Sequence, residues 1–568
     1  MTRRQRSYPV APPGLWDRED MRSALAARDM GAVITIFRRW TGASQTDIGV
    51  LLGMPQPHVS DFERGIRHAT SLAMFERLAD GLGIPRPLLG LADSQHDHDE
   101  ARPGRTREKP SRETPTIRSA DFMAWLAEQS KTSFRVLYDR LAARIQQLAR
   151  IPDPERTHRA YLYGRVTREQ VVTALAQYYR TPLPTDCTFY NVQVDGTTSP
   201  TTVLTRPGWL STRIPLGAEA ERFEYVSPSV APIPPPHLDG DALTAAINRL
   251  ATAELSSTVL TNDPLYRLLR IAVQPARLDA SVTSMSFADY ALTMDLLESE
   301  LIETLAEENT AASARASARA SARASARARS RRLPLRDAYL PSVLHALDME
   351  HRICAGGPVA LLAAARPANA IGRKQPDYAL LVQERSPRVL NAVGKLAVIP
   401  KAFHQPTVEP AAEAHLSTSL LRELEEELLG REELGDLFSS DFRNIDPFHT
   451  DLLSAPLRWL LERKDSDAYR IECVGFGINL LSGNYEFACL IVIDDEEWWG
   501  RFGGQLQANW EVERIRLYSS RDTASLRDLM RDPQWSNEGL FAFSEGLRRL
   551  AELDTRQRVA APFIDVET

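Results

Sequence analysis

The sequence predicts a multidomain protein in which an all-α N-terminal domain is followed by α+β domains. Its 568 residues suggest about three or four domains of roughly 150 residues each. Residues 31–90 carry short helical patterns without a strand signal, whereas strand patterns begin only near residue 188. Two polar segments, residues 94–116 and 312–332, contain no apolar stripe, so we expect them to connect folded parts.

The composition is that of a globular protein, with 43% hydrophobic and 25% charged residues. The net charge of −7 excludes a wholly basic, histone-like protein but allows one basic domain. Four scattered cysteines without a C-x-x-C pair argue against a zinc ribbon or a disulfide framework and fit a reducing cytoplasm. No apolar run is long enough to span a membrane, so we expect a cytoplasmic protein without a membrane partner. Only six lysines occur among the 68 basic residues, a codon usage that indicates a GC-rich bacterial genome.

These shifts in pattern predict six consecutive segments. They are a lead-in (1–30), an all-α domain (31–92), a linker (93–118), an α+β middle domain (119–308), an Ala/Ser/Arg-rich low-complexity tether (309–332) and an α+β C-terminal domain (333–568). The tether is built on a repeated Ala-Ser-Ala-Arg unit. We expect it to be flexible, although alanine favours a transient helix.

The clearest pattern is a pair of short helices in the sequence SQTDIGVLLGMPQPHVSDFERG, residues 44–65. Ser44 is placed to cap a helix that begins at Gln45, and apolar residues follow at helical spacing. Gly53 permits a sharp turn before a second helix that begins at Gln56 and ends at Gly65.

This pattern resembles the Xre/Cro-type helix-turn-helix family of phage-repressor-like DNA-binding domains, and the resemblance covers residues 33–89. The residues that carry it are Gln45, Gly53, Gln56, Val59, Ser60, Glu63, Gly65, Leu78, Ala79, Leu82 and Gly83. In that family the second helix of the motif enters the major groove of double-stranded DNA, and its first residues meet base edges. Such modules act as dimers on paired half-sites, so the resemblance also implies a homodimer.

Carried over to this chain, the resemblance places four residues of the second helix at the DNA. Gln56 contacts a base or a phosphate, and Pro57, Ser60 and Asp61 face the groove. Pro57 replaces a common polar reader and has no N–H to donate. Asp61 is suited to accept from a cytosine amino group but repels phosphate.

The same resemblance assigns roles to residues around the second helix. Gln45 holds a phosphate through its side chain and its helix N-terminus, and Arg67 contacts the DNA backbone. Arg38 aligns with a family arginine that pairs with the glutamate at position 63, which predicts an Arg38–Glu63 ion pair. Residues 31–90 carry six arginines against five acids, so tight binding is expected to need a dimer or flanking arginines.

The remaining elements are helices and strands in mixed order. Thr167 and Gln170 form a T-x-x-Q capping box, and Asp195-Gly196 indicates a hairpin between two strands. Residues 378–383 and 472–494 are rich in strand formers, and residues 416–429 predict an amphipathic helix. Residues 119–308 match no motif; we expect an α+β domain of unknown type that mediates dimerisation or forms part of the sensor.

A second, weaker motif lies in LRELEEELLG, residues 421–430. Glu423, Glu426 and Glu427 stand at i, i+3 and i+4, so their carboxylates are expected on one helix face, a donor set that suits Mg²⁺ or Mn²⁺. With Arg422 they resemble the core of a Nudix box, which implies a metal-bound hydrolase in which Glu423 also acts in catalysis. The box is degenerate, because Ala414 occupies the position of a family glutamate and Glu413 is one residue away.

The sequence therefore predicts a DNA-binding transcriptional regulator whose C-terminal region senses a small molecule, a nucleotide among the candidates, or a protein partner. Its C-terminal domain would then be a Nudix-like fold with little activity or an unrelated α+β domain with a solvated acidic helix. The alternative from another class is a metal-dependent Nudix-type nucleoside-diphosphate hydrolase with an autoregulatory DNA-binding domain. A third is an interaction scaffold. The sequence establishes no cofactor, and Mg²⁺ or Mn²⁺ is expected only if the C-terminal domain is an active Nudix domain.

Overall fold

A computed structural model describes most of the chain between residues 15 and 567. The described ranges are 15–26, 29–41, 43–52, 56–64, 78–79, 84–85, 120–150, 164–180, 183–255, 260–317, 332–368, 375–386, 394–429, 453–463, 468–503, 512–560 and 564–567, together with the single residues 12, 82, 88, 392, 466 and 506. The chain divides into two units, residues 1–112 (unit 1) and residues 113–568 (unit 2). None of the helices in these ranges is both long and apolar enough to cross a lipid bilayer.

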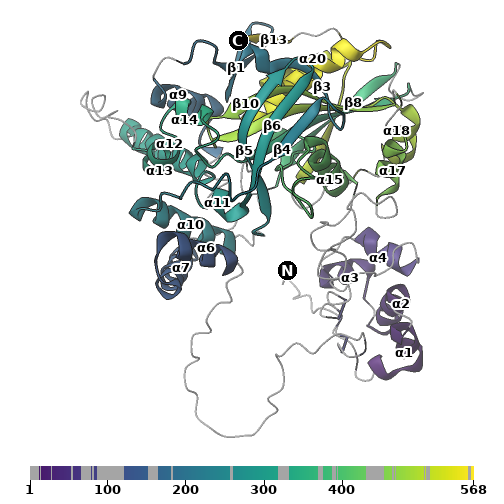
Figure 1. Cartoon of the computed structure of the whole chain (residues 1–568). Helices are drawn as coiled ribbons and strands as arrows, with labels where there is room; N and C mark the ends of the chain where they lie inside the picture. The colour runs from purple at the N-terminus through teal and green to yellow at the C-terminus, as the bar shows by residue number, and fades with distance from the viewer. Residues whose placement is uncertain are drawn as a thin grey trace. The chain divides into compact units, whose positions relative to one another are not determined.

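Unit 1 is helical throughout its described residues (Figure 1). A 3₁₀ turn (Leu15–Asp17) is followed by α1 (Glu19–Ala26), α2 (Met30–Thr41), α3 (Gln45–Leu51) and α4 (Gln56–Glu63). The buried residues that join these helices are Leu15, Met21, Leu25, Val33, Ile34, Phe37, Ile48, Leu52, Val59 and Phe62. They recur at helical spacing, so each short helix is stabilised by its apolar face and not by its length.

Unit 2 mixes helices and strands. Its helices are α6 (Ala120–Ser130), α7 (Phe134–Leu148), α9 (Arg168–Tyr178), α10 (Gly240–Leu255), α11 (Phe287–Ala291), α12 (Leu296–Ser317), α13 (Pro334–Tyr339), α14 (Val343–Leu347), α15 (Leu416–Leu428), α17 (Ala455–Leu461), α18 (Glu496–Phe502), α19 (Thr523–Arg531) and α20 (Asn537–Leu553). Its strands are β1 (Thr188–Val194), β2 (Thr197–Thr205), β3 (Leu210–Pro215), β4 (Glu221–Tyr225), β5 (Pro264–Gln274), β6 (Arg277–Ser286), β7 (Gly356–Arg366), β8 (Asp377–Arg385), β9 (Leu396–Val398), β10 (Tyr469–Asn479), β11 (Asn484–Ile493), β12 (Val512–Ser519) and β13 (Ile564–Glu567).

The described strands of unit 2 form a large mixed sheet and a small one. The large sheet has the order β12-β8-β7-β11-β10-β2-β1-β13, with β3 on β10 and β9 on β8. The small sheet has the order β4-β6-β5. Strand β7 runs parallel to β11, and most other pairs are antiparallel.

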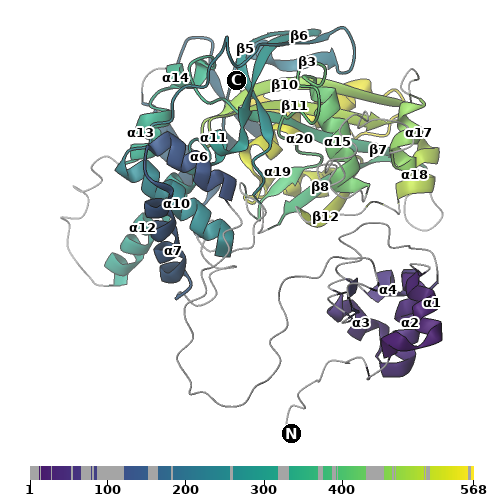
Figure 2. The same ribbon diagram turned by 60° about the horizontal axis from the view of Figure 1, so that its bottom comes forward.

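Helices α15 and α20 pack against opposite faces of β7. Leu362 of this strand lies in the same apolar cluster as Leu420 of α15, whereas Leu361 lies in the cluster of Phe541 of α20. Successive strand residues point to opposite faces, so β7 supplies core side chains to both layers and is buried along its whole length. The helices α6, α7, α10 and α12 gather at one end of unit 2, and α17 and α18 lie at the other (Figures 1 and 2).

The expected separation of residues 119–308 from residues 333–568 differs from the structure. Strand β10 pairs with β2 through Ile478–Leu204 and Asn479–Val203, so both segments contribute to one sheet. They also share one apolar cluster that runs from Phe122 to Trp498. The physical reason is that β2 and β3 supply backbone partners to an edge of β10 that would otherwise stay unpaired.

The two expected connections are only partly visible. Helix α12 extends to Ser317, so the beginning of the Ala-Ser-Ala-Arg repeat is helical, consistent with the high helix propensity of alanine. Residues 318–331 and the linker 93–118 lie outside the described residues.

Two local predictions in unit 2 are confirmed. Thr167 and Gln170 form the expected reciprocal capping box at the start of α9. Asp195 and Gly196 both have positive φ angles, 48° and 74°, and connect β1 to β2 in a tight hairpin.

Candidate functional site

A chain of polar contacts joins three helices of unit 1. Nη1 of Arg38 on α2 lies 2.6 and 2.8 Å from the two carboxylate oxygens of Glu63 on α4, which is the ion pair expected from the sequence. Nε2 of Gln45 donates to Oε2 of Glu63 at 2.6 Å, and Nε2 of Gln56 donates to Oε1 of Gln45. The first residues of α3 and α4 are thus held together by their own side chains.

The start of α3 is fixed by a reciprocal cap. Oγ of Ser44 accepts from the backbone N–H of Asp47 at 3.1 Å, and the Asp47 carboxylate accepts from the backbone N–H of Ser44 at 3.0 Å. An acidic side chain in the first helical turn also interacts favourably with the helix dipole. The cap explains why Gln45 is the first residue of α3, as the sequence predicts.

The groove-facing residues predicted from the sequence lie on α4. Gln56 is exposed at its first position, Pro57 is its second residue, and Ser60 is half-buried. Asp61 pairs with Arg64 at 2.6 Å, a partner that the sequence analysis did not identify. This ion pair offsets the negative charge that Asp61 would present to a phosphate. Arg67, Gly53 and Gly65 lie outside the described residues.

Gly31 on α2 permits the close approach of α4. A Cβ atom at this position would lie 2.0 Å from the backbone oxygen of Phe62. A backbone carbonyl cannot rotate away as a flexible side chain can, so any larger residue would push the two helices apart.

In unit 2, the helix predicted around the glutamate motif is present as α15, but its carboxylates do not form the expected metal site. Oε2 of the fully buried Glu427 accepts from the backbone N–H of Lys401 at 3.0 Å. Glu425 accepts from the backbone N–H and the hydroxyl of Ser454, at the start of α17. Within the described ranges, no group of three or more His, Cys, Asp or Glu side chains is arranged to hold a metal ion.

Of the three predicted ligands, Glu427 is therefore engaged by the protein backbone. Arg422, the buried arginine of the motif, donates to the backbone oxygen of Gln405 at 3.1 Å. Arg422, Glu425 and Glu427 thus attach neighbouring segments to α15.

Glu413 has a structural role in one of these loops. Its carboxylate accepts from the backbone N–H groups of Thr407, Val408 and Glu409. Burial alone would raise the pKa of Glu413, but these bonds and a further one from the Thr407 hydroxyl together outweigh it and hold the pKa below its ordinary value. The carboxylate closes the loop before α15.

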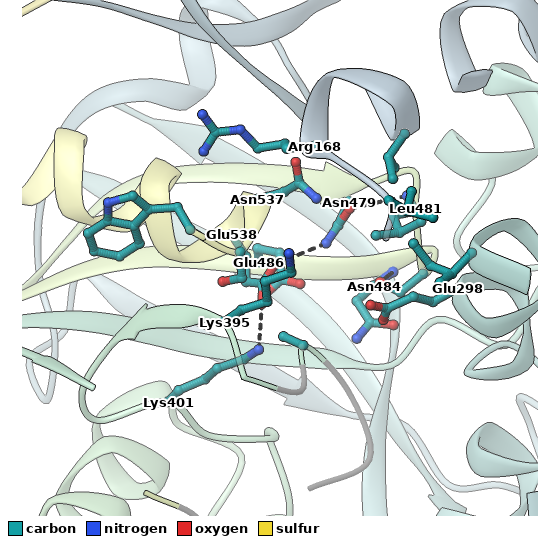
Figure 3. A pocket seen from close by; sticks show the side chains of 17 residues that line it. Arg168, Glu298, Lys395, Lys401, Asn479, Leu481, Asn484, Glu486, Asn537 and Glu538 are labelled. Carbon is teal, nitrogen blue, oxygen red and sulfur yellow. Dashed lines mark hydrogen bonds and ion pairs between the residues drawn. The ribbon is translucent and has the colours of Figure 1, made fainter. Parts of the chain in front are cut away.

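A polar cavity in unit 2 was not anticipated from the sequence. The space that the centre of a water-sized sphere can occupy is about 50 Å³, within a wider region of about 620 Å³ that includes open solvent. Its polar lining consists of Arg168, Glu298, Lys395, Lys401, Asn479, Ser482, Asn484, Glu486, Ser536, Asn537 and Glu538, and its apolar lining of Val166, Val171, Ile302, Ala392, Leu481 and Trp535 (Figure 3). These residues come from α9, α12, β10, β11, α20 and loops, including the loops on either side of β9, which explains why no sequence motif marks the cavity.

An ion pair spans one part of the cavity. Nζ of Lys401 lies 2.6 Å from Oε1 of Glu538, and Nδ2 of Asn479 donates to Oε2 of the same carboxylate at 3.2 Å (Figure 3). Burial alone would raise the pKa of Glu538, but the charge of Lys401 and the hydrogen bonds from Lys401, Ser536 and the backbone together outweigh it, and the pKa lies below its ordinary value. Glu538 is therefore a carboxylate with its charge compensated at neutral pH.

At Glu486 and Lys395, in contrast to Glu538, the surroundings disfavour the charged form of the side chain. Complete burial and the nearby charge of Glu538 raise the pKa of Glu486 well above its ordinary value, so its neutral form is favoured. Burial also lowers the pKa of the Lys395 ammonium. The cavity thus contains one compensated carboxylate, one carboxyl that resists ionisation and a desolvated lysine.

Comparison with known proteins finds one family for this chain. Residues 29–91 match the family described as a helix-turn-helix domain. No curated protein matches the chain as a relative. The match begins at the residue before α2 and includes the contact chain from Arg38 to Gln56. Residues 29–91 are therefore a helix-turn-helix DNA-binding module, and the protein is, at this level, a DNA-binding regulator.

Proposed function

We propose that the chain is a sequence-specific, Xre/Cro-type transcriptional regulator in which unit 1 binds operator DNA and unit 2 senses a small molecule. The observation that carries the DNA-binding part is the Arg38–Glu63–Gln45–Gln56 contact chain. It holds the exposed start of α4 against the start of α3, the arrangement needed to present one helix to the groove and the other to a phosphate.

The DNA-binding part is tested by selecting bound fragments from genomic DNA with the full chain and then measuring affinity by fluorescence anisotropy. We expect Gln56→Ala to reduce affinity for the selected site about tenfold and to affect random DNA much less, because a base contact is worth roughly 1–3 kcal/mol. Arg67→Ala, at the proposed backbone contact, should weaken both. Equal loss on both DNAs for Gln56→Ala would contradict its assignment as a base contact.

The sensing part is supported by the polar cavity of unit 2, far in sequence from the DNA-binding helices. A ligand changes DNA affinity only if it binds the DNA-competent state with a different free energy. The test is the operator affinity of the full chain with and without a bound small molecule. If saturating ligand leaves that affinity unchanged, the sensing role is wrong.

We also propose that the regulator acts as a homodimer on two half-sites about one DNA turn apart. Light scattering coupled to size exclusion, on the free chain and its operator complex, measures the stoichiometry. A single protomer on a palindromic site at saturation would exclude the dimer.

The alternative of a Nudix-type nucleoside-diphosphate hydrolase rests on the R-E-x-x-E-E helix beside a mixed sheet. The engagement of Glu427 with the backbone of Lys401 makes it the weaker proposal. It requires Mg²⁺-dependent turnover by the full chain that is lost in Glu423→Gln and in Glu426→Gln. Turnover that survives both substitutions would exclude the box as its source.

A further inference from the structure

Arg168 places a buried cation with unused donors at the cavity. It is 5% exposed, and its Nε and Nη1 atoms have no hydrogen-bond partner among the described residues. Burial lowers the pKa of its guanidinium, against the charges of Glu169 and Asp532. Burial of a guanidinium with two unpaired donors is unfavourable, and an anion bound in the cavity would supply the missing partners.

Asn484 adds an unused acceptor to the same cavity. Its Nδ2 donates to the hydroxyl of Tyr290 at 3.1 Å, which fixes the orientation of the amide. Its Oδ1 is buried and has no partner among the described residues. In Figure 3, Arg168 lies on one side of the cavity and Asn484, with Glu298, on another. The cavity therefore has a free anion-binding group and a free acceptor at separate places.

The balance of charge in the cavity favours an anion. Lys401 and Glu538 neutralise each other, and Glu486 resists ionisation. Among the remaining charged groups of the lining, Arg168 and Lys395 are basic and Glu298 is acidic. The excess is positive, and the apolar part of the lining is suited to contact a carbon skeleton.

We propose that this cavity binds a small organic anion whose carboxylate or phosphate group pairs with Arg168 and Lys395 and whose hydroxyl or amino group donates to Oδ1 of Asn484. The guanidinium of arginine suits both anionic groups, because its N–H donors form charge-assisted hydrogen bonds with carboxylate and phosphate oxygens. The proposal rests on the sensing role of unit 2 and names the chemistry of its ligand.

The test uses the full chain, isothermal titration calorimetry and thermal unfolding. The probes are inorganic phosphate, glucose 6-phosphate, succinate and citrate, with glucose as the uncharged control. We expect at least one anionic probe to bind and to raise the unfolding temperature, and glucose to do neither. Whether the phosphates or the carboxylates bind identifies the anionic group. Failure of all four anions, or equal binding of glucose, would overturn the proposal.

Arg168→Met is the deciding variant, with Arg180→Met as the matched control because Arg180 is exposed just beyond the end of α9. If Arg168 serves a ligand, its replacement should weaken binding of the anionic probe at least tenfold while the unfolding temperature of the ligand-free protein stays equal or rises. Arg180→Met should change neither. Retained affinity in Arg168→Met would overturn the proposal, as would a lowered unfolding temperature together with unchanged probe binding.

Lys395→Met provides a second, independent variant, because Lys395 lies in the loop just before β9, whereas Arg168 lies on α9. We expect weaker binding of the anionic probe and no binding of glucose. Operator affinity is measured in parallel to separate the two proposals. Probe binding without a change in operator affinity would support the anion site and contradict the sensing role. Operator binding without any probe binding would overturn the anion site and leave the DNA-binding module unaffected.

Discussion

Gln56, the first residue of α4, donates its side-chain N–H to Oε1 of Gln45, the first residue of α3. Gln45 donates in turn to Glu63, which Arg38 neutralises. Each glutamine donates to the next residue in the series, Gln56 to Gln45 and Gln45 to Glu63. Each side-chain amide is therefore held in one orientation. The exposed start of α4 at Gln56 is thereby held in place through the Arg38–Glu63 ion pair at the end of the same helix.

We predict that Arg38→Met loosens unit 1. Its Nη1 contacts both oxygens of Glu63, and the two side chains are 29% and 12% exposed, so solvent screens the pair only in part. The loss should be about 1–2 kcal/mol. Hydrogen exchange followed by mass spectrometry should show faster exchange in α2 to α4. Arg39→Met, the exposed neighbour, is the control, and equal exchange in both variants would contradict the role of the pair.

Gly31→Ala should separate α2 from α4, because the added Cβ would meet the backbone oxygen of Phe62 at 2.0 Å. Overpacking of this kind costs about 1–3 kcal/mol, so operator affinity should fall together with exchange protection in unit 1. Gly164→Ala in unit 2 is the control, since a Cβ there meets nothing within 4 Å. Operator affinity that survives Gly31→Ala would show that this close approach is not required.

Asp61→Asn should increase affinity for DNA of any sequence. The substitution removes a negative charge from the predicted groove face and releases Arg64, which is 60% exposed, for phosphate contact. One additional phosphate contact steepens the plot of log affinity against log salt by about 0.9. Anisotropy titrations at several salt concentrations measure this slope. Asp20→Asn, at an exposed pair in α1, is the control; an unchanged slope in Asp61→Asn would contradict the prediction.

Glu486→Gln should stabilise unit 2 at neutral pH. The folded-state pKa of Glu486 lies above that of the unfolded chain, so the folded state holds a proton that the unfolded state releases. The free energy of unfolding therefore falls as the pH rises from the ordinary glutamate pKa through the folded-state pKa of Glu486. Glutamine does not titrate, so the variant does not lose this stability. Thermal unfolding should show Glu486→Gln above the wild type at pH 8 and equal to it near pH 4.5.

Glu538→Gln serves as the opposite case in the same experiment. Its folded-state pKa lies below the unfolded value, so its contribution is present above the ordinary glutamate pKa and is lost as the pH falls through the folded one. Removal of the partner of Lys401 should cost about 3 kcal/mol at pH 8 and less in acid. The same sign of change at pH 8 in both variants would contradict the assignment of the two carboxyls.

Local structure was predictable from the sequence wherever neighbours in the chain interact. Ser44 and Asp47, Thr167 and Gln170, and the Asp195-Gly196 turn all act within four residues, so composition and spacing suffice to locate them. The glutamate motif shows the limit of such reasoning. Its helix formed as predicted, but the contact of Glu427 with Lys401 spans 26 residues and changes what the carboxylate does.

The sequence by itself determined the helix-turn-helix module, because its short helices, caps and apolar faces are encoded within about sixty consecutive residues of one pattern. Only the tertiary structure decided that residues 119–308 and 333–568 share a sheet, since the pairing of β2 with β10 joins strands more than 250 residues apart. The cavity, too, is decided only by the tertiary structure. Arg168 and Asn484 line the same cavity only because α9 and β11 pack into one unit. Their spacing along the chain does not predict this.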